Sequence, residues 1–190
     1  MKIICLNAPP DSGKTQVQKH LVRCHDNADI ESFKNGLTTV TRSFYDVTKD
    51  TWDEWYTTEG KEKVRSELNG MSCREALIHV SEHVIKPIFG DQVFGEMLVK
   101  RVNKLEKYTD LLIIDDNGFG DELVPLAHEY GANNLFQIRI HREGKSFKKD
   151  SRNWVDKHYF QASFDLVNNG TLVDLFRQSE YITNLIVNKF

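Results

Sequence analysis

The stretch Ala8-Pro9-Pro10-Asp11-Ser12-Gly13-Lys14-Thr15 decides how this chain folds. It follows a short apolar run at residues 2–6 that predicts a buried strand, and it precedes an amphipathic pattern at residues 14–24 that predicts a helix. Gly-Lys-Thr between a strand and a helix is the context of a P-loop, in which backbone N–H groups and the helix N-terminus bind phosphate groups. The sequence therefore predicts a phosphate-binding loop at residues 8–15.

The side chains of this loop have separate predicted roles. Lys14 is expected to contact the β- and γ-phosphates of ATP, and the Thr15 hydroxyl is expected to bind Mg²⁺. Ala8 stands where the consensus has its first glycine, which matters only if that position requires a positive φ. The residues expected to contact ATP are Pro10, Asp11, Ser12, Gly13, Lys14, Thr15 and Gln16.

Apolar runs elsewhere predict further buried strands, at residues 111–115, 135–140 and 164–167. Runs without a polar alternate face are typical of a parallel sheet covered on both sides. Helical patterns lie between them, including residues 122–130 followed by Gly131. The alternation predicts an α/β, three-layer P-loop NTPase fold.

We expect a single P-loop kinase domain over residues 1–190, with a core at 1–32 and 108–190. The interval 33–107 has an almost wholly helical pattern and is too long for one crossover connection. It is therefore predicted to be a helical insertion that binds the acceptor.

Two carboxylates follow the predicted strand at 111–115. Asp115 and Asp116 end an apolar run, where a metal-binding acid of a nucleotide site is expected. Either could hold Mg²⁺ directly or through water, together with Thr15, and the spacing does not choose between them. Acids at a strand end can also be no more than solvated surface groups.

Overall composition narrows the class of protein. The 25 basic and 28 acidic residues nearly cancel, which argues against a general nucleic-acid binder. The three cysteines are scattered without metal-ligand spacing, which favours a reducing compartment. The N-terminal apolar run is too short for a signal peptide, and no stretch approaches the ~20 apolar residues of a membrane helix. We expect a cytoplasmic protein without nucleic-acid or membrane partners.

A basic segment distinguishes between classes of P-loop protein. Asn103-Lys104-Leu105-Glu106, the nearest match to a GTPase guanine motif, lies in a predicted helix, and an oligomeric ATPase generally needs a longer chain. Residues 139–157 contain seven Lys or Arg, Lys149 among them, against three Asp or Glu, and predict a phosphate-covering lid at about 142–156. Arg142 and Arg152 are its candidates for the transferring phosphoryl group, and Arg139 lies within the strand pattern. A basic surface loop is the alternative.

Four further blocks carry a resemblance to a known family. They are Ser32-Phe33-Lys34, Met71-Ser72-Cys73-Arg74-Glu75-Ala76-Leu77, Asp116-Asn117-Gly118-Phe119-Gly120-Asp121-Glu122 and Val167-Asn168-Asn169-Gly170-Thr171-Leu172-Val173-Asp174-Leu175. In this order the chain resembles, over most of its length, the deoxynucleoside monophosphate kinases of bacteriophages, which are relatives of adenylate kinase. Gly118 replaces an arginine of the family pattern, so acceptor specificity is expected to differ.

The resemblance implies transfer of the γ-phosphoryl group of ATP to a (deoxy)nucleoside monophosphate, with Mg²⁺, for nucleotide supply to DNA synthesis. It implies the host cytoplasm if the chain is phage-encoded, and the insertion could serve as a homodimer surface. The preferred base stays open, as do a kinase for another phosphorylated acceptor such as phosphomevalonate and a nucleotide-binding module without turnover. Lys14, Arg142 and Arg152 are the catalytic candidates. The acceptor-binding candidates are Lys34, Arg42, Arg65, Arg74 and Lys86, each of which could be only a surface charge.

Two other patterns in the insertion allow alternative interpretations. Its aromatic residues are expected mostly to form a small core, although Phe44, Tyr45 or Trp52 could stack on a base. His79-Val80-Ser81-Glu82-His83 matches the motif of inverted zinc metallopeptidases, which is a hypothesis of another class.

Overall fold

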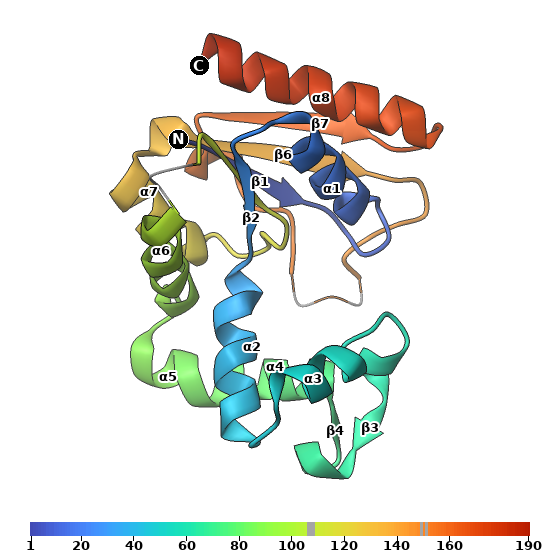
Figure 1. Ribbon diagram of the computed structural model, residues 1–190, viewed down its shortest axis with the longest axis vertical. Helices are drawn as coiled ribbons and strands as arrows, with labels where there is room; N and C mark the ends of the chain where they lie inside the picture. The colour runs from blue at the N-terminus through green and yellow to red at the C-terminus, as the bar shows by residue number, and fades with distance from the viewer. Residues whose placement is uncertain (106–108, 149, 151) are drawn as a thin grey trace. The chain divides into compact units, whose positions relative to one another are not determined.

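The chain divides into two compact units in the computed structural model, which describes residues 1–105, 109–148, 150 and 152–190 (Figure 1). The first unit comprises Met1–Phe33 and Gly95–Phe190, and the second is Lys34–Phe94. The predicted insertion boundary at residues 107 and 108 lies outside the described residues. The second unit ends earlier, and most of the helix that follows it, α6 (Val93–Leu105), belongs to the first.

A five-stranded parallel sheet organises the first unit, as the buried apolar runs predicted. Its strand order is β2-β5-β1-β6-β7, and every pairing is parallel. The strands are β1 (Lys2–Asn7), β2 (Ala28–Glu31), β5 (Leu111–Ile114), β6 (Leu135–His141) and β7 (Ala162–Val167). The edge strand β2 was not predicted because it is only four residues long and has no apolar run.

Helices cover both faces of this sheet and complete three layers. On β1, Ile4 and Leu6 pack into one buried cluster with α1 (Lys14–Cys24) and α8 (Leu172–Lys189). Ile3 and Cys5 point to the opposite face and pack with α6 and α7 (Val124–Tyr130), as strand alternation requires. Figure 1 shows α1 and α8 on one side of the sheet. Because β1 is central, the loop that follows it lies at the middle of the sheet edge.

The second unit is helical but contains a β-hairpin that the sequence analysis did not predict. Its strands β3 (Val64–Arg65) and β4 (Met71–Ser72) are antiparallel. Asn69 and Gly70 both have positive φ (54° and 80°), a conformation typical of hairpin turns. The helices are α2 (Phe33–Phe44), α3 (Lys49–Trp55), α4 (Cys73–His79), a π-helical segment (Val80–Ile85) and α5 (Lys86–Phe89).

Aromatic side chains of the second unit form its small core, as expected for most of them. Trp52 is 1% exposed and packs with Leu68 and Leu77, and Trp55 and Tyr56 pack against this cluster. Two of the predicted insertion aromatics behave differently: Phe33 is buried in the first unit, and Phe44 is 55% exposed.

Two of the helices begin with a reciprocal cap. Ser72 and Glu75 form a reciprocal capping box at the start of α4, and Thr171 and Asp174 form another at α8. No helix in the described part of the chain is long and apolar enough to cross a bilayer.

Candidate active site

The loop at residues 8–13 joins the carboxyl end of the central strand β1 to α1 through two left-handed residues. Asp11 has φ 59°, and Gly13, the N-cap of α1, has φ 97°. Ala8 is buried and is not among the described residues with positive φ. Alanine in place of the consensus glycine therefore carries no backbone strain at this position.

Polar groups in this loop are left without partners. The carbonyl of Gly13 accepts hydrogen bonds from Gln16 N (3.0 Å) and Val17 N (3.1 Å), whereas the N–H groups of Gly13, Lys14 and Thr15 have no acceptor within the described part of the chain. The buried Ser12 hydroxyl likewise has no partner among the described residues. Free donors at a helix N-terminus carry partial positive charge, so the loop is suited to bind an anion.

Charged side chains converge at Lys14. Burial lowers the pKa of Lys14 to about 8, and Arg152 lowers it further, while Asp115, Asp116 and Asp150 act in the opposite direction. The structure thus brings together the predicted phosphate lysine, one predicted lid arginine and the two predicted metal carboxylates. Asp150 was not predicted.

Of the two acids after β5, Asp116 has a positioning role. Its carboxylate accepts hydrogen bonds from Ser32 Oγ (2.6 Å) and Phe33 N (3.0 Å), and it thereby holds the end of β2. Thr15 is exposed in the first turn of α1. Asp115 has interactions of its own as well, so both acids stay candidates for Mg²⁺.

Arg152 is held by an acid of its own segment. Asp150, whose side chain is 2% exposed, accepts hydrogen bonds from Arg152 Nε (3.0 Å) and Nη2 (2.6 Å). The stem of Arg152 crosses Gly118, where an added Cβ atom would lie 2.6 Å from Arg152 Cβ and 2.7 Å from its Cδ. Gly118, which replaces the family arginine, therefore makes room for an arginine from another segment.

A buried amide that the sequence analysis missed fixes the segments around this cluster. Asn7 Nδ2 donates to the carbonyls of Asn117 (2.9 Å) and Asn153 (3.1 Å), and Asn7 Oδ1 accepts from Val155 N (2.9 Å). Gln137 on β6 donates to the Val155 carbonyl at 3.2 Å. The sequence signal for this role was a polar Asn at the end of an apolar strand, directly before the loop. Its amide holds together the residue before Gly118 and the residue after Arg152.

The predicted lid begins against the loop. Arg142 Nη1 donates to the Asp11 carbonyl (3.0 Å), and Lys145 Nζ lies 3.3 Å from the Asp11 carboxylate. Asn168, in the turn before α8, donates to the Ser12 carbonyl at 2.9 Å. The described residues of 142–156 form neither helix nor strand, and Lys149 lies outside them.

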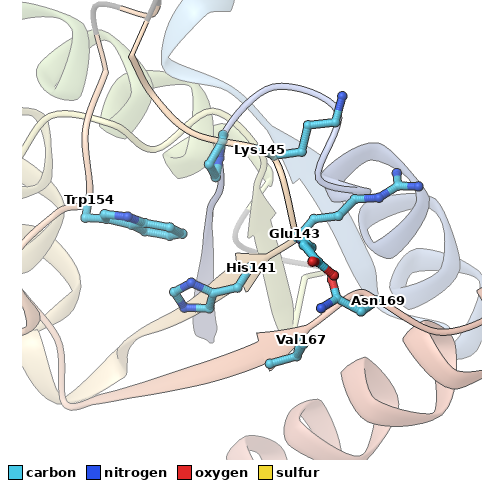
Figure 2. Close-up of a pocket in the computed structure, with 8 residues that line it drawn as sticks. His141, Glu143, Lys145, Trp154, Val167 and Asn169 are labelled. Carbon is cyan, nitrogen blue, oxygen red and sulfur yellow. The ribbon is translucent and has the colours of Figure 1, made fainter.

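A pocket of about 320 Å³ lies beside the loop (Figure 2). The rings of His141 and Trp154 stack at its wall, with centroids 4.6 Å apart. Figure 2 shows Glu143 next to Asn169, whose side chain accepts a hydrogen bond from Glu143 N at 2.9 Å. The residues that line the pocket are Pro9, His141, Arg142, Glu143, Lys145, Trp154, Val167 and Asn169. Pockets of this size are at the lower end of those that bind small molecules.

Arg139, the less certain lid candidate, is part of the sheet. It donates to both carboxylate oxygens of Asp165 (2.8 and 2.9 Å), its register partner on β7, and His141 Nε2 lies 2.7 Å from the same carboxylate. The Arg139 guanidinium, together with His141 and Lys157, holds the pKa of Asp165 well below its usual range. This network fixes the strand that leads to the lid.

Asp165→Asn is expected to lower Tm at pH 7 by about 2 °C, because the Asp165 carboxylate is partly exposed and screening limits the stabilisation to about 1 kcal/mol. A depressed pKa contributes its full stability above the pKa of the unfolded carboxyl and loses it as pH falls through the lower pKa of the folded carboxyl. The difference from wild type should therefore begin to shrink below about pH 4 and should keep shrinking as the solution is made more acidic. Thermal melts from pH 7 down to about pH 2 measure this, and a difference that stays constant below about pH 4 would contradict it.

All five predicted acceptor cations lie in the second unit, with different partners. Lys34 Nζ lies over the Tyr56 ring (4.7 Å from its centroid), and the Arg65 guanidinium lies over Trp55 (4.3 Å). The Nε atom of Arg65 is buried without a hydrogen-bond partner among the described residues. Because β3 pairs with β4, which leads directly into α4, Arg65 and Arg74 are on neighbouring segments.

The remaining acceptor candidates, Arg74, Arg42 and Lys86, lie on helices of the second unit. Arg74 Nη1 is 3.6 Å from Glu62, and Lys86 donates to Glu82 at 2.8 Å. Arg42 is half-buried in the last turn of α2. The second unit therefore offers a pair of neighbouring arginines and three separate cations.

The zinc-peptidase pattern gains no support from the geometry. His79 and His83 have ring centroids 5.4 Å apart, but Glu82 accepts hydrogen bonds from Ser81 and Lys86. Among the described residues, no third side chain joins the two histidines in a potential metal-binding group.

No family model matches this chain, and a search of curated proteins found no relative.

Proposed function

We propose that this protein is a kinase that transfers the γ-phosphoryl group of ATP to a (deoxy)nucleoside monophosphate, giving ADP and the diphosphate. One observation carries the proposal: at the N-terminus of α1, the N–H groups of Gly13, Lys14 and Thr15 and the buried Ser12 hydroxyl have no partner among the described residues. Free donors at a helix N-terminus beside a buried ammonium group favour a ligand with several negative charges. A triphosphate supplies them.

In this proposal the loop binds the ATP phosphates. The N–H groups of Gly13, Lys14 and Thr15 donate to phosphate oxygens, and the Lys14 ammonium contacts the terminal phosphates. The nucleoside of ATP occupies the pocket beside Pro9 and Arg142, whose aromatic wall provides a flat apolar surface for a base.

The residues present fit Mg²⁺, which prefers oxygen ligands. The oxygen donors are the Thr15 hydroxyl in the first turn of α1 and the carboxylates of Asp115 and Asp116, which follow β5. Bound Mg²⁺ neutralises charge on the phosphate oxygens of ATP.

The proposed reaction breaks the bond between Pγ and the β–γ bridging oxygen and forms a bond from an acceptor phosphate oxygen to Pγ. The acceptor oxygen is already anionic near neutral pH, so no side chain has to remove a proton. Arg142 and Arg152 stabilise the charge on the transferring group. Asp150 is a positioning residue that orients Arg152.

The acceptor phosphate is assigned to the second unit. Arg65, with Arg74 on the neighbouring segment, is the strongest candidate, because its buried Nε has no hydrogen-bond partner among the described residues and could donate to an oxyanion. Lys34, Arg42 and Lys86 remain candidates for the same anion.

A coupled ADP-release assay across the four dNMPs and the four NMPs tests the function. Turnover with at least one of them, dependent on Mg²⁺, supports the proposal. Turnover only with a non-nucleotide phosphorylated acceptor such as phosphomevalonate would show that the protein is a kinase for another class of substrate. ATP binding without acceptor-dependent ADP at any concentration identifies a binding module.

Gly118→Ala is expected to lower kcat by about 100-fold, since the new methyl group displaces the Arg152 stem from its track. Overpacking should also lower Tm by a few degrees. The same substitution in an Arg152→Ala background should change kcat little, because the displaced group is already absent. Equal losses in both backgrounds, from steady-state rates, would refute the coupling.

A further inference from the structure

Three side chains with different metal-binding atoms meet on the first unit, away from the proposed active site. His20 and Cys24 are one turn apart on α1, and Glu180 lies on α8, which packs against α1. The candidate ligand atoms of these three residues all lie within 4.8 Å of one another. None of them has a role in the proposed kinase reaction.

The distances match those of a shared tetrahedral ion. His20 Nε2 is 3.6 Å from Cys24 Sγ and 3.6 Å from Glu180 Oε2. Bond lengths of about 2.0–2.1 Å to nitrogen, 2.3 Å to sulfur and 2.0–2.2 Å to oxygen place tetrahedral ligands roughly 3.6 Å (N to S) and 3.4 Å (N to O) apart. One ring nitrogen therefore already lies at the required separation from both other ligands.

A second contact fixes the orientation of this imidazole. The His20 ring stacks on Phe176 with centroids 4.2 Å apart and planes within 6°, and its side chain is 18% exposed. Phe176 precedes Glu180 by one turn of α8. The same helix thus orients the histidine and supplies the carboxylate, so the ligands are positioned before any ion binds.

We propose that His20, Cys24 and Glu180 form a binding site for a divalent transition-metal ion of the Zn²⁺ class, which joins α1 to α8. Nitrogen, sulfur and oxygen donors together select such an ion over Mg²⁺ or Ca²⁺, which prefer oxygen ligands. Three protein ligands leave the fourth tetrahedral position to water. Binding replaces the proton of the Cys24 thiol, which passes to solvent.

The sequence did not indicate this site because its ligands come from two distant segments. The cysteines show no metal-ligand spacing among themselves, and the His-Cys pair at i, i+4 becomes meaningful only when α8 brings Glu180 beside it. An ion here would link the two helices whose first turns border the loop, since Asn168 and Leu175 approach Ser12 and Gly13.

The test uses the full chain, freed of metal with a chelator and kept reduced with a phosphine. Titration with Co²⁺ should give one equivalent bound with a thiolate-to-cobalt charge-transfer band, and Zn²⁺ should displace it and raise Tm by several degrees. Cys24→Ser should abolish the band and weaken Zn²⁺ binding by about 100-fold, and Glu180→Gln should weaken binding by about tenfold while keeping the band.

The matched control is His79→Gln with His83→Gln, which removes the other histidine pair and should leave the titration unchanged. The proposal is overturned if no Co²⁺ band develops, or if the band and the affinity survive Cys24→Ser. Circular dichroism of the metal-free variants checks that they fold. ADP release by the metal-free protein with ATP and Mg²⁺ does not depend on this site. A failure of Co²⁺ binding would therefore leave the proposed kinase activity unaffected, and a failure of ADP release would leave the metal site unaffected.

Discussion

Replacing Lys14 by Met is expected to lower kcat by about 1,000-fold while leaving the folded protein at least as stable as wild type at pH 7. Activity should fall because the ammonium group stabilises charge on the transferring phosphoryl group. Stability should not fall, because burial and Arg152 depress the pKa of Lys14 to about 8 and thus disfavour its charged form in the fold. Methionine keeps the stem and removes the buried charge.

Steady-state ADP release and thermal melts of the two proteins measure both halves of this expectation. ATP should raise Tm of wild type much more than that of the variant, since the lost charge-assisted contacts weaken ATP binding by about 10- to 150-fold. Lys19→Met, at an exposed position of the same helix, is the matched control and should retain activity. A variant that turns over normally would exclude the loop as the phosphate site.

Arg152→Ala is expected to lower kcat by about 1,000-fold with a smaller effect on KM for ATP. The guanidinium is near enough to Lys14 to lower its pKa, and the buried Asp150 carboxylate holds it, so its position is set before substrate binds. Arg152→Lys should recover little activity, because an ammonium group cannot reproduce the two-bond contact with Asp150.

The control for this prediction is Arg177→Ala, which removes an exposed arginine of α8. Asp150→Asn should reduce kcat by a smaller factor than Arg152→Ala, and the double variant should resemble Arg152→Ala alone, as expected for a residue that acts through Arg152. Unaltered kcat in Arg152→Ala would assign the transferring group to Arg142 or to other cations.

The main sheet could be predicted because its signal is local. Each of the central strands is an apolar run whose residues are buried on both faces, as Leu112 on one face and Ile113 on the other illustrate. The edge strand β2 escaped prediction because one of its faces is open, with Ile30 41% exposed and acidic residues on either side. The Asn69-Gly70 turn was a readable signal that the helical interpretation of the insertion overlooked.

The candidate site was only partly predictable because its geometry depends on long-range contacts. Lys14 follows from a contiguous motif, but the roles of Asp116 and Asn7 depend on partners about a hundred residues or more away. Sequence spacing cannot reveal such partners. The strand pattern already contained Arg139, but only the structure shows that its register partner Asp165 accepts its hydrogen bonds.

The residues at positions 118 and 152 are complementary in size. A glycine at 118 leaves a track for the long side chain at 152, and an arginine at 118 would fill the same space. Substitutions at these two sites are therefore expected to compensate each other during divergence. A sequence motif that requires arginine at position 118 would therefore miss proteins that supply an equivalent charge from position 152.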